Sequence, residues 1–138
     1  MILQRVEYAA LNSRQQENYN FQKAAGLLAD YGFNCLRLSD DWQGADFIAC
    51  HIDGETFLKV QLKGRLVADR KYAGRGVHIA FFHRGDLYLY NHDDFVSILE
   101  AEARIGADSV TWHEKGFRNW PSPPAWALSY LAPFRISA

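Results

Sequence analysis

The chain has 138 residues and a formal net charge of −1, from 15 Lys and Arg against 16 Asp and Glu. With 49% hydrophobic and 14% aromatic residues it can bury a core, which excludes a mainly disordered or fibrous chain. The balanced charge excludes a uniformly basic coat for nucleic acid, so any contact with nucleic acid must come from local clusters of Lys and Arg.

The first expected element is a helix over residues 13–31. Ser13 and Gln16 form a capping-box pattern, and the apolar residues from Phe21 to Leu28 then recur at helical spacing. A short strand at 34–39 follows the helix.

A loop at 40–44 then leads into the clearest hairpin of the sequence. The strand-like segments 45–52 and 56–63 flank Asp53-Gly54, a dipeptide that tolerates positive φ at both central positions of a turn. These two segments are therefore expected to pair as antiparallel neighbours.

Residues 64–76 mix glycines with cations and predict a loop, with a short helical turn as an option. A strand at 77–82 resumes, and a turn at 83–86 leads into the next strand at 87–91. Asp93 or Asp94 can then cap a helix, so the expected order is α-β-β-β-β-β-α.

The C-terminal segment is aromatic, and Ser122 can cap a short helix there. Its apolar surface is too large for a loose terminus, so we expect it to cover the sheet or, as the alternative, to form a homodimer interface. We expect a single domain over 1–138, with a core at about 13–104 and this extension at about 105–138. The aromatic residues are Trp112, Phe117, Trp120, Trp126, Tyr130 and Phe134.

A carboxylate is expected to point from the first helix toward the sheet. Glu17 lies four residues before Phe21 and eleven before Leu28, and these spacings place all three on one helix face. The alternative is a solvated acid in the first helical turn that complements the helix dipole.

The hairpin brings further polar groups onto one face. If Asp53-Gly54 forms a two-residue loop, Asp46 lies opposite Gln61; if the loop has four residues, Asp46 lies opposite Lys63. Either register leaves the three side chains on the same face, because side chains alternate along a strand. The alternative is an ordinary salt bridge between Asp46 and Lys63 at a sheet edge.

These groups form an oxygen-rich set. The Asp46 carboxylate, the Gln61 amide oxygen and the Leu62 carbonyl, with Glu17 in the outer shell, suit hard cations such as Mg²⁺ or Mn²⁺. Lys63 beside them can orient or help deprotonate a water molecule and offset charge that grows on a phosphoryl group. The chemistry that this set favours is phosphodiester hydrolysis.

Gly44-Ala45-Asp46-Phe47-Ile48 and Val60-Gln61-Leu62-Lys63, after a helix that carries Glu17, resemble the PD-(D/E)XK, or restriction-endonuclease-like, nucleases. The resemblance covers about residues 13–100. It implies an α+β fold with an αβββαβ core, a central mixed sheet flanked by helices, Asp46 as metal ligand and Lys63 as the motif lysine. Ala45 replaces the motif proline, and Gln61 replaces an acid, which should weaken binding of a divalent cation.

A cationic segment follows the hairpin directly. Such a cluster can hold several phosphates, and Tyr72 within it can stack on an exposed base. The alternative is a solvated loop whose tyrosine packs inward. The candidate nucleic-acid-binding residues are Arg65, Arg70, Lys71, Tyr72 and Arg75.

The sequence therefore predicts a Mg²⁺- or Mn²⁺-dependent endonuclease with catalytic residues Glu17, Asp46, Gln61 and Lys63, acting on DNA rather than RNA. The alternatives are a noncatalytic nucleic-acid-binding or assembly module of the same fold, or a partner-binding domain. Without a signal-peptide pattern or a run of roughly 18 apolar residues, we expect a cytoplasmic protein. A homodimer is expected as an option, because cutting two strands favours two active sites.

Overall fold

A six-stranded mixed sheet forms the centre of the computed structural model, which describes residues 1–105, 112 and 115–137. Its strand order is β1-β2-β3-β5-β6-β8, and all neighbours are antiparallel except the parallel pair β3 and β5. The strands are β1 (Phe33–Trp42), β2 (Ala45–His51), β3 (Phe57–Lys63), β5 (Val77–His83), β6 (Asp86–Asn91) and β8 (Arg135–Ile136).

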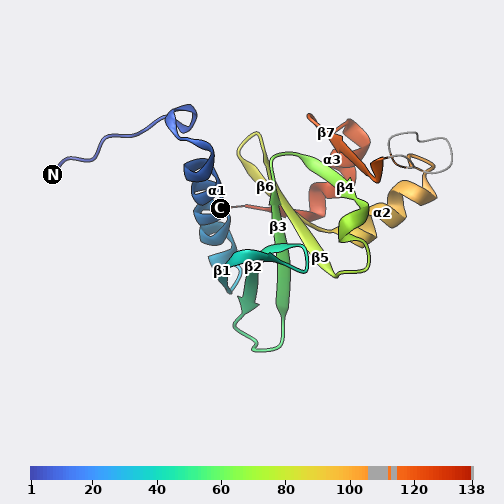
Figure 1. The fold of residues 1–138 in the computed structure, drawn as a ribbon, viewed down its shortest axis with the longest axis horizontal. Helices are drawn as coiled ribbons and strands as arrows, with labels where there is room; N and C mark the ends of the chain where they lie inside the picture. Colours follow the sequence, from blue (N-terminus) through green and yellow to red (C-terminus); the bar gives the residue numbers. More distant parts are fainter. Residues whose placement is uncertain (106–111, 113–114, 138) are drawn as a thin grey trace.

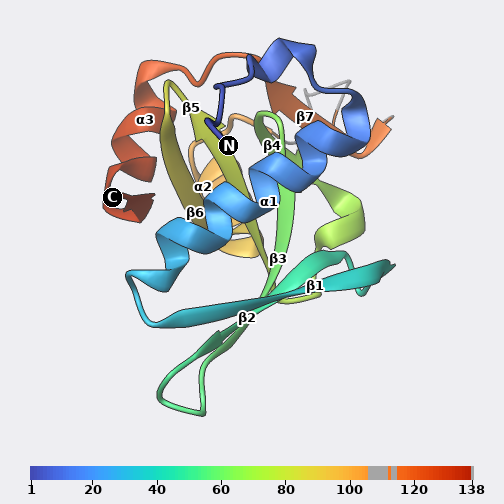
Figure 2. The ribbon, with the colours of Figure 1, turned by 90° about the vertical axis from the view of Figure 1, so that its left-hand side faces the viewer.

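Helices cover both faces of this sheet (Figure 1). α1 (Ser13–Ala29) lies across one face, as Figure 2 shows, and α2 (His92–Ala101) and α3 (Ala125–Leu131) lie on the other. The pleat explains how one strand serves two layers: Leu87 of β6 packs in the cluster under α1, whereas Tyr90 packs in the cluster under α2 and α3. The expected α+β class, with a central mixed sheet flanked by helices, is confirmed.

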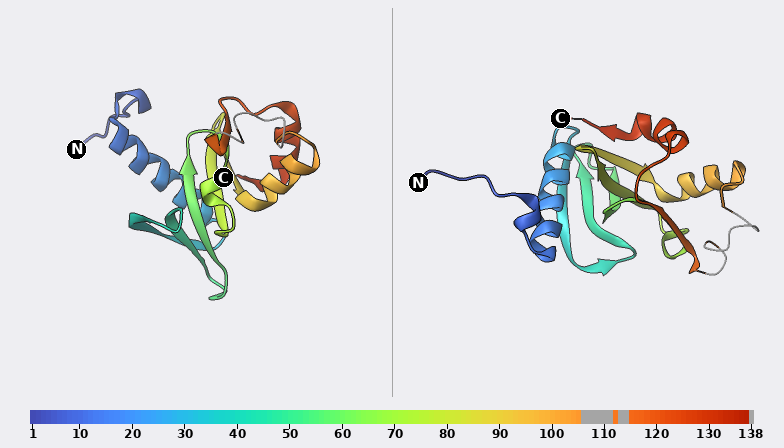
Figure 3. Two further views of the ribbon diagram at one scale, coloured as in Figure 1. Left: turned by 45° about the vertical axis from the view of Figure 1, so that its right-hand side comes forward. Right: turned by 90° about the horizontal axis from the view of Figure 1, so that it is seen from above.

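α1 begins with a capping box, one residue earlier than expected. The Asn12 side chain accepts a hydrogen bond from the Gln15 N–H at 2.9 Å, and the Gln15 side chain accepts one from the Asn12 N–H at 2.9 Å. Ser13 is therefore the first helical residue and not the cap, since asparagine caps as well as serine does. Before α1, a short 3-10 helix, η1 (Tyr8–Ala10), ends an N-terminal arm that extends away from the body (Figure 3).

β1 and β2 form a tighter hairpin than the expected loop at 40–44. The turn consists of Gln43 and Gly44, with φ of 54° and 83°, so β1 continues to Trp42. A register shift between Arg37 and Trp42 allows the longer strand to follow the twist of the sheet. The second expected hairpin, β5–β6, is present and turns at Arg84 and Gly85.

The connection between the parallel strands contains more structure than the expected loop. β4 (Leu66–Asp69) pairs with β7 (Phe117–Trp120) in a small second sheet, and the 3-10 helix η2 (Arg70–Tyr72) follows it. η2 is the helical element described between β3 and β5, where the αβββαβ pattern implies a helix.

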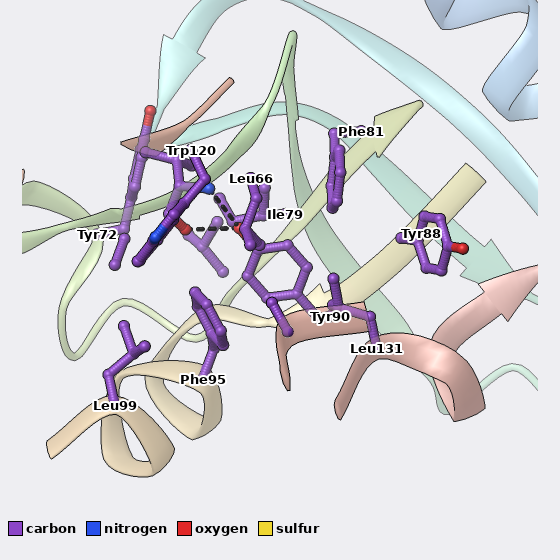
Figure 4. Packing of buried hydrophobic residues seen from close by; sticks show 14 of the residues in the cluster. Leu66, Tyr72, Ile79, Phe81, Tyr88, Tyr90, Phe95, Leu99, Trp120 and Leu131 are labelled. Carbon is purple, nitrogen blue, oxygen red and sulfur yellow. Dashed lines mark hydrogen bonds between the residues drawn. The ribbon is translucent and has the colours of Figure 1, made fainter. Parts of the chain in front are cut away.

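A buried tyrosine holds β4 against the main sheet (Figure 4). The Tyr90 hydroxyl donates to the Val67 carbonyl at 2.5 Å and accepts from the Val67 N–H at 3.1 Å. Burial raises the pKa of Tyr90 above its ordinary value, so the hydroxyl stays neutral and keeps both bonds. β4 in turn carries the chain from the end of β3 to η2.

The C-terminal segment covers the sheet, which was the first of its two expected roles. Trp120 is buried, and Trp126 and Tyr130 pack against the cluster that contains Phe95 of α2. Pro124 precedes α3, so the expected Ser122 cap does not form. α2 likewise begins after Asn91, whose side chain accepts from the backbone of Asp94, and not after an aspartate. Within the described residues, no helix is both long and apolar enough to cross a membrane.

Candidate active site

The β2–β3 hairpin has the register expected for a two-residue turn. Phe47 pairs with Val60 and Cys50 with Phe57, and the His51 N–H donates to the Thr56 carbonyl at 2.9 Å. The tip is wider than the dipeptide alone, because the regular ladder closes at His51 and Thr56. The Asp53 carboxylate fills that tip: it accepts the Thr56 hydroxyl at 2.6 Å and its N–H at 2.8 Å, and these bonds hold the pKa of Asp53 below its ordinary range.

Counted from the tip of the hairpin, the backbone pairing of β2 with β3 ends one residue short of the predicted acid, Asp46. Beyond Phe47 and Val60 no further pair forms, and the Asp46 carboxylate instead accepts the backbone N–H of Leu62 at 2.9 Å. A side chain thus replaces the backbone of β2 at this point. Because the N–H and C=O of a strand residue point to the same neighbour, the Leu62 carbonyl also faces the gap that Asp46 occupies.

This divergence opens a cavity of about 350 Å³ that brings the predicted residues together. Phe47 and Leu62 pack on the α1 side of the sheet, and Asp46, Gln61 and Lys63 alternate with them toward the other side. Glu17, exposed on α1, reaches the cavity where the strands separate. The cavity is lined by Glu17, Asn20, Phe21, Arg37, Asp46, Phe47, Gln61, Leu62, Lys63 and Gly64.

The oxygen groups of this cavity fit a hard divalent cation. Gln61 Oε1 is buried and has no hydrogen-bond partner within the described part of the chain, an arrangement that ordinarily costs about 1–3 kcal/mol. A cation would satisfy that oxygen together with the Asp46 carboxylate and the Leu62 carbonyl. In the same described part, no three His, Cys, Asp or Glu side chains gather so that they could hold a metal ion, so a cation here would need neutral oxygens as ligands beside Asp46.

Arg37 is a residue of this cavity that the sequence analysis missed. It lies on β1 opposite Phe47, its guanidinium donates to the Asn18 side chain, and it lies 5.5 Å from the centre of the Phe21 ring. The turn sequence did not predict it: counted from the Trp42–Ala45 pair at the turn, Arg37 would lie opposite Cys50, and the register shift between Arg37 and Trp42 places it opposite Phe47 instead. The guanidinium adds a second cation to the cavity, suited to a phosphate oxygen.

The four predicted cations after the hairpin, Arg65, Arg70, Lys71 and Arg75, are exposed. The guanidinium of each arginine donates a hydrogen bond. Arg65 donates to the Asn119 side chain at 3.0 Å, Arg70 to the Trp112 carbonyl at 2.7 Å and Arg75 to the Gln43 side chain at 3.0 Å. Lys71 lies 3.9 Å from Asp69, a weak ion pair. A groove of about 270 Å³, lined by Arg65, shares Lys63 and Gly64 with the cavity. Arg65 therefore lies next to the candidate active site.

Tyr72 corrects one prediction. Only 2% of the residue is exposed, so its ring cannot stack on a base as predicted. It packs edge to face with His92, and a Cβ added at Gly44 would lie 3.0 Å from the ring. The Lys63 and Lys71 ammonium groups lie 5.3 and 5.1 Å from its centre. Burial of this large aromatic ring stabilises the fold. Because the ring lies next to the Lys63 ammonium, Tyr72 packs beside Lys63 and does not contact a base.

His92 fixes the start of η2 and makes the fold sensitive to pH. Its Nε2 accepts the Asp69 N–H at 2.9 Å, and burial lowers the pKa of the imidazole below 6.5. The unfolded chain therefore takes up a proton first as pH falls, so the stability that the neutral ring supports is complete above about pH 6.5 and is lost below it. We expect the free energy of unfolding, measured in urea, to fall below that pH by up to about 1.4 kcal/mol per unit for this histidine.

His92→Gln should show a smaller loss of stability between pH 7.5 and 5.5 than the unaltered protein. Some dependence remains, because burial also lowers the pKa of His78. His83→Gln, in the β5–β6 hairpin, is the matched control and should keep the original slope. Equal slopes for the two variants would contradict this role for His92.

No family model and no curated protein sequence matches the chain. Among solved structures, it is similar to a bacterial homing endonuclease, I-Ssp6803I, with 21% sequence identity and a TM-score of 0.45, over 63% of this chain and 71% of that chain. The chemistry of the site is therefore inferred from its own residues and contacts.

Proposed function

We propose that the protein is a metal-dependent endonuclease of the PD-(D/E)XK type that hydrolyses phosphodiester bonds in DNA. The observation that carries the proposal is the single cavity that gathers Glu17, Asp46, Gln61 and Lys63 where β2 and β3 separate. Two acids, an amide oxygen without a partner among the described residues, and a lysine are costly to place together unless they serve a ligand.

Asp46, Gln61 and the Leu62 carbonyl would hold Mg²⁺ or Mn²⁺, with Glu17 in the outer shell. When bound, such a cation lowers the pKa of water and polarises a phosphoryl oxygen. Lys63 orients the attacking water and offsets the charge that grows on the phosphoryl group. The Leu62 N–H keeps the Asp46 carboxylate in position through the 2.9 Å hydrogen bond.

The cations around the cavity supply the contacts to the rest of the substrate. Arg37 lies within the cavity, and Arg65 lines the groove that continues from Lys63. Arg70, Lys71 and Arg75 are exposed farther along the chain and would supply additional phosphate contacts. Each phosphate neutralised adds to affinity and to its dependence on salt, so binding should weaken steeply between 50 and 200 mM salt if several act together, as is general for such contacts.

A second candidate function is supported by one observation. Gln61 replaces an acid, which removes one negative charge from the ligand set and lowers affinity for a divalent cation. A noncatalytic nucleic-acid-binding module would keep the cationic surface without useful metal binding.

Supercoiled plasmid and single-stranded DNA separate the two functions. We expect the purified protein to nick or cut them in Mg²⁺ or Mn²⁺, and to leave them intact in EDTA. Salt-dependent binding with no cleavage in either metal would retire the catalytic proposal and favour the module. Parallel reactions with RNA test the choice of DNA as substrate.

Gln61→Glu is expected to bind Mn²⁺ more tightly than the unaltered protein, because it restores a charged oxygen at the same position. The gain should be roughly tenfold, equivalent to about 1.4 kcal/mol, and isothermal titration calorimetry in the absence of DNA measures it. Gln22→Glu, on the exposed surface of α1, adds the same charge outside the cavity and should leave the affinity unchanged. Unchanged affinity in Gln61→Glu would contradict its assignment as a ligand.

A further inference from the structure

A second cavity, of about 580 Å³, adjoins the candidate active site on the α1 side. It shares Asn20, Lys63 and Gly64 with the first cavity and extends to Phe82 and Gly85 at the β5–β6 turn. Its size falls within the range of about 300–1,000 Å³ that is usual for small-molecule sites. The predicted catalytic residues leave this space unused, apart from Lys63 at its border.

Two exposed tyrosines form one wall of this cavity and are held firmly. Tyr8 and Tyr19 are each 42% exposed, and their rings meet edge to face with centres 5.3 Å apart. The Asn20 amide donates to the Tyr8 hydroxyl at 2.9 Å, and the Gln16 amide donates to the Tyr8 carbonyl at 3.2 Å. The aromatic pair is therefore organised before any ligand arrives, which lowers the entropy that binding must cost.

The remaining groups match a planar ligand attached to phosphate. Leu27 and Phe82 add apolar surface to the cavity. The Lys23 ammonium lies 5.5 Å from the centre of the Tyr19 ring, and Lys63 stands at the border with the active site. Aromatic rings bind the faces of nucleobases, and cations bind the phosphates that join them.

We propose that this cavity, named here the base cavity, binds an unpaired nucleobase next to the phosphate to be cut. A base within a duplex has neighbours stacked on both faces and must leave the stack before it can lie against Tyr8 and Tyr19. The substrate class is therefore single-stranded or locally unpaired DNA. The part of this inference that concerns cleavage rests on the proposed function, whereas the binding part does not.

The test measures binding in EDTA, so that no cleavage is needed. Fluorescence anisotropy compares a single strand, a perfect duplex and a duplex with one unpaired base, each carrying 2-aminopurine. We expect tighter binding of the two unpaired substrates, with quenching of 2-aminopurine as it stacks. Tyr19→Ala should weaken that binding about tenfold and abolish the quenching, and Tyr19→Phe should retain both.

Tyr31→Ala is the matched control, because Tyr31 is 43% exposed and lies beyond the C-terminal end of α1, where its hydroxyl contacts Ser137. It should bind as the unaltered protein does. If Tyr19→Ala does not fold, as judged by circular dichroism, Tyr19→Leu provides the same loss of stacking with a larger apolar side chain.

Equal affinity for paired and unpaired DNA, or an unchanged Tyr19→Ala, would overturn the base cavity. If either result is accompanied by metal-dependent cleavage, the nuclease proposal is supported and only the base cavity is rejected. Binding of unpaired DNA that depends on Tyr19, without cleavage in any metal, supports the base cavity and retires the nuclease.

Discussion

Asp46→Asn is expected to abolish cleavage while leaving the fold intact. The carboxylate has two separable roles: one oxygen accepts the Leu62 N–H, and the negative charge completes the proposed cation site. Asparagine keeps an oxygen acceptor for that N–H and removes the charge. Because a bound cation would lower the activation barrier by several kcal/mol, we expect at least a hundredfold lower cleavage rate when its site is lost. Single-turnover cleavage of labelled DNA in Mg²⁺ measures it.

Asp46→Ala separates the two roles. Alanine also removes the oxygen that accepts the partly buried Leu62 N–H. The free energy of unfolding of Asp46→Ala, measured in urea, should therefore be about 1–3 kcal/mol lower than that of Asp46→Asn. Asp30→Asn, at the C-terminal end of α1, loses the same charge outside the site and should cleave normally. Full activity in Asp46→Asn would remove Asp46 from the site and with it the proposed mechanism.

The part of the site that lies on one hairpin was accessible to sequence reasoning. Asp53-Gly54 indicates the turn, and the turn fixes which residues of β2 and β3 oppose each other. The side-chain alternation then places Asp46, Gln61 and Lys63 on one face. All of this depends on residues within about twenty positions of each other.

The separation of β2 from β3 was not accessible in that way. Ideal pairing would continue to Asp46 and Gln61, and the ladder instead ends at Phe47 and Val60. The gap that results lets Glu17 reach the cavity from the α1 side of the sheet. Strand separation depends on how the whole sheet twists and on what packs against it, so a pattern of residue types does not contain it.

The short helical turn given as an option within residues 64–76 is present as η2, but β4 and the burial of Tyr72 were missed for a related reason. Glycines and cations there predict a loop, yet β4 forms because Tyr90 and β7, far along the chain, supply its hydrogen-bond partners. Once β4 leads into η2, Tyr72 is drawn under Lys63 and away from solvent. Local propensity describes this segment poorly because its partners are distant in sequence.

Lys63→Met is expected to slow cleavage by about 10²–10⁴-fold, the usual contribution of a positioned acid or base. Methionine retains an apolar stem of similar length, so packing near the Tyr72 ring is kept while the ammonium is removed. Binding of uncut DNA in EDTA should fall far less, by about one phosphate contact, because the other cations remain. Single-turnover rates and anisotropy on the same oligonucleotide report the two effects separately.

Two further variants identify what the ammonium does. Lys59→Met alters the same residue type on the same strand face, outside the cavity, and should cleave at the unaltered rate. Lys63→Arg keeps a positive charge that does not give up its proton at neutral pH. Substantial cleavage by Lys63→Arg would assign Lys63 to orienting water and offsetting charge, whereas a loss as large as in Lys63→Met would assign it to proton transfer. Normal cleavage by Lys63→Met would exclude both roles and would leave Lys63 as a contact to phosphate at the border of the base cavity.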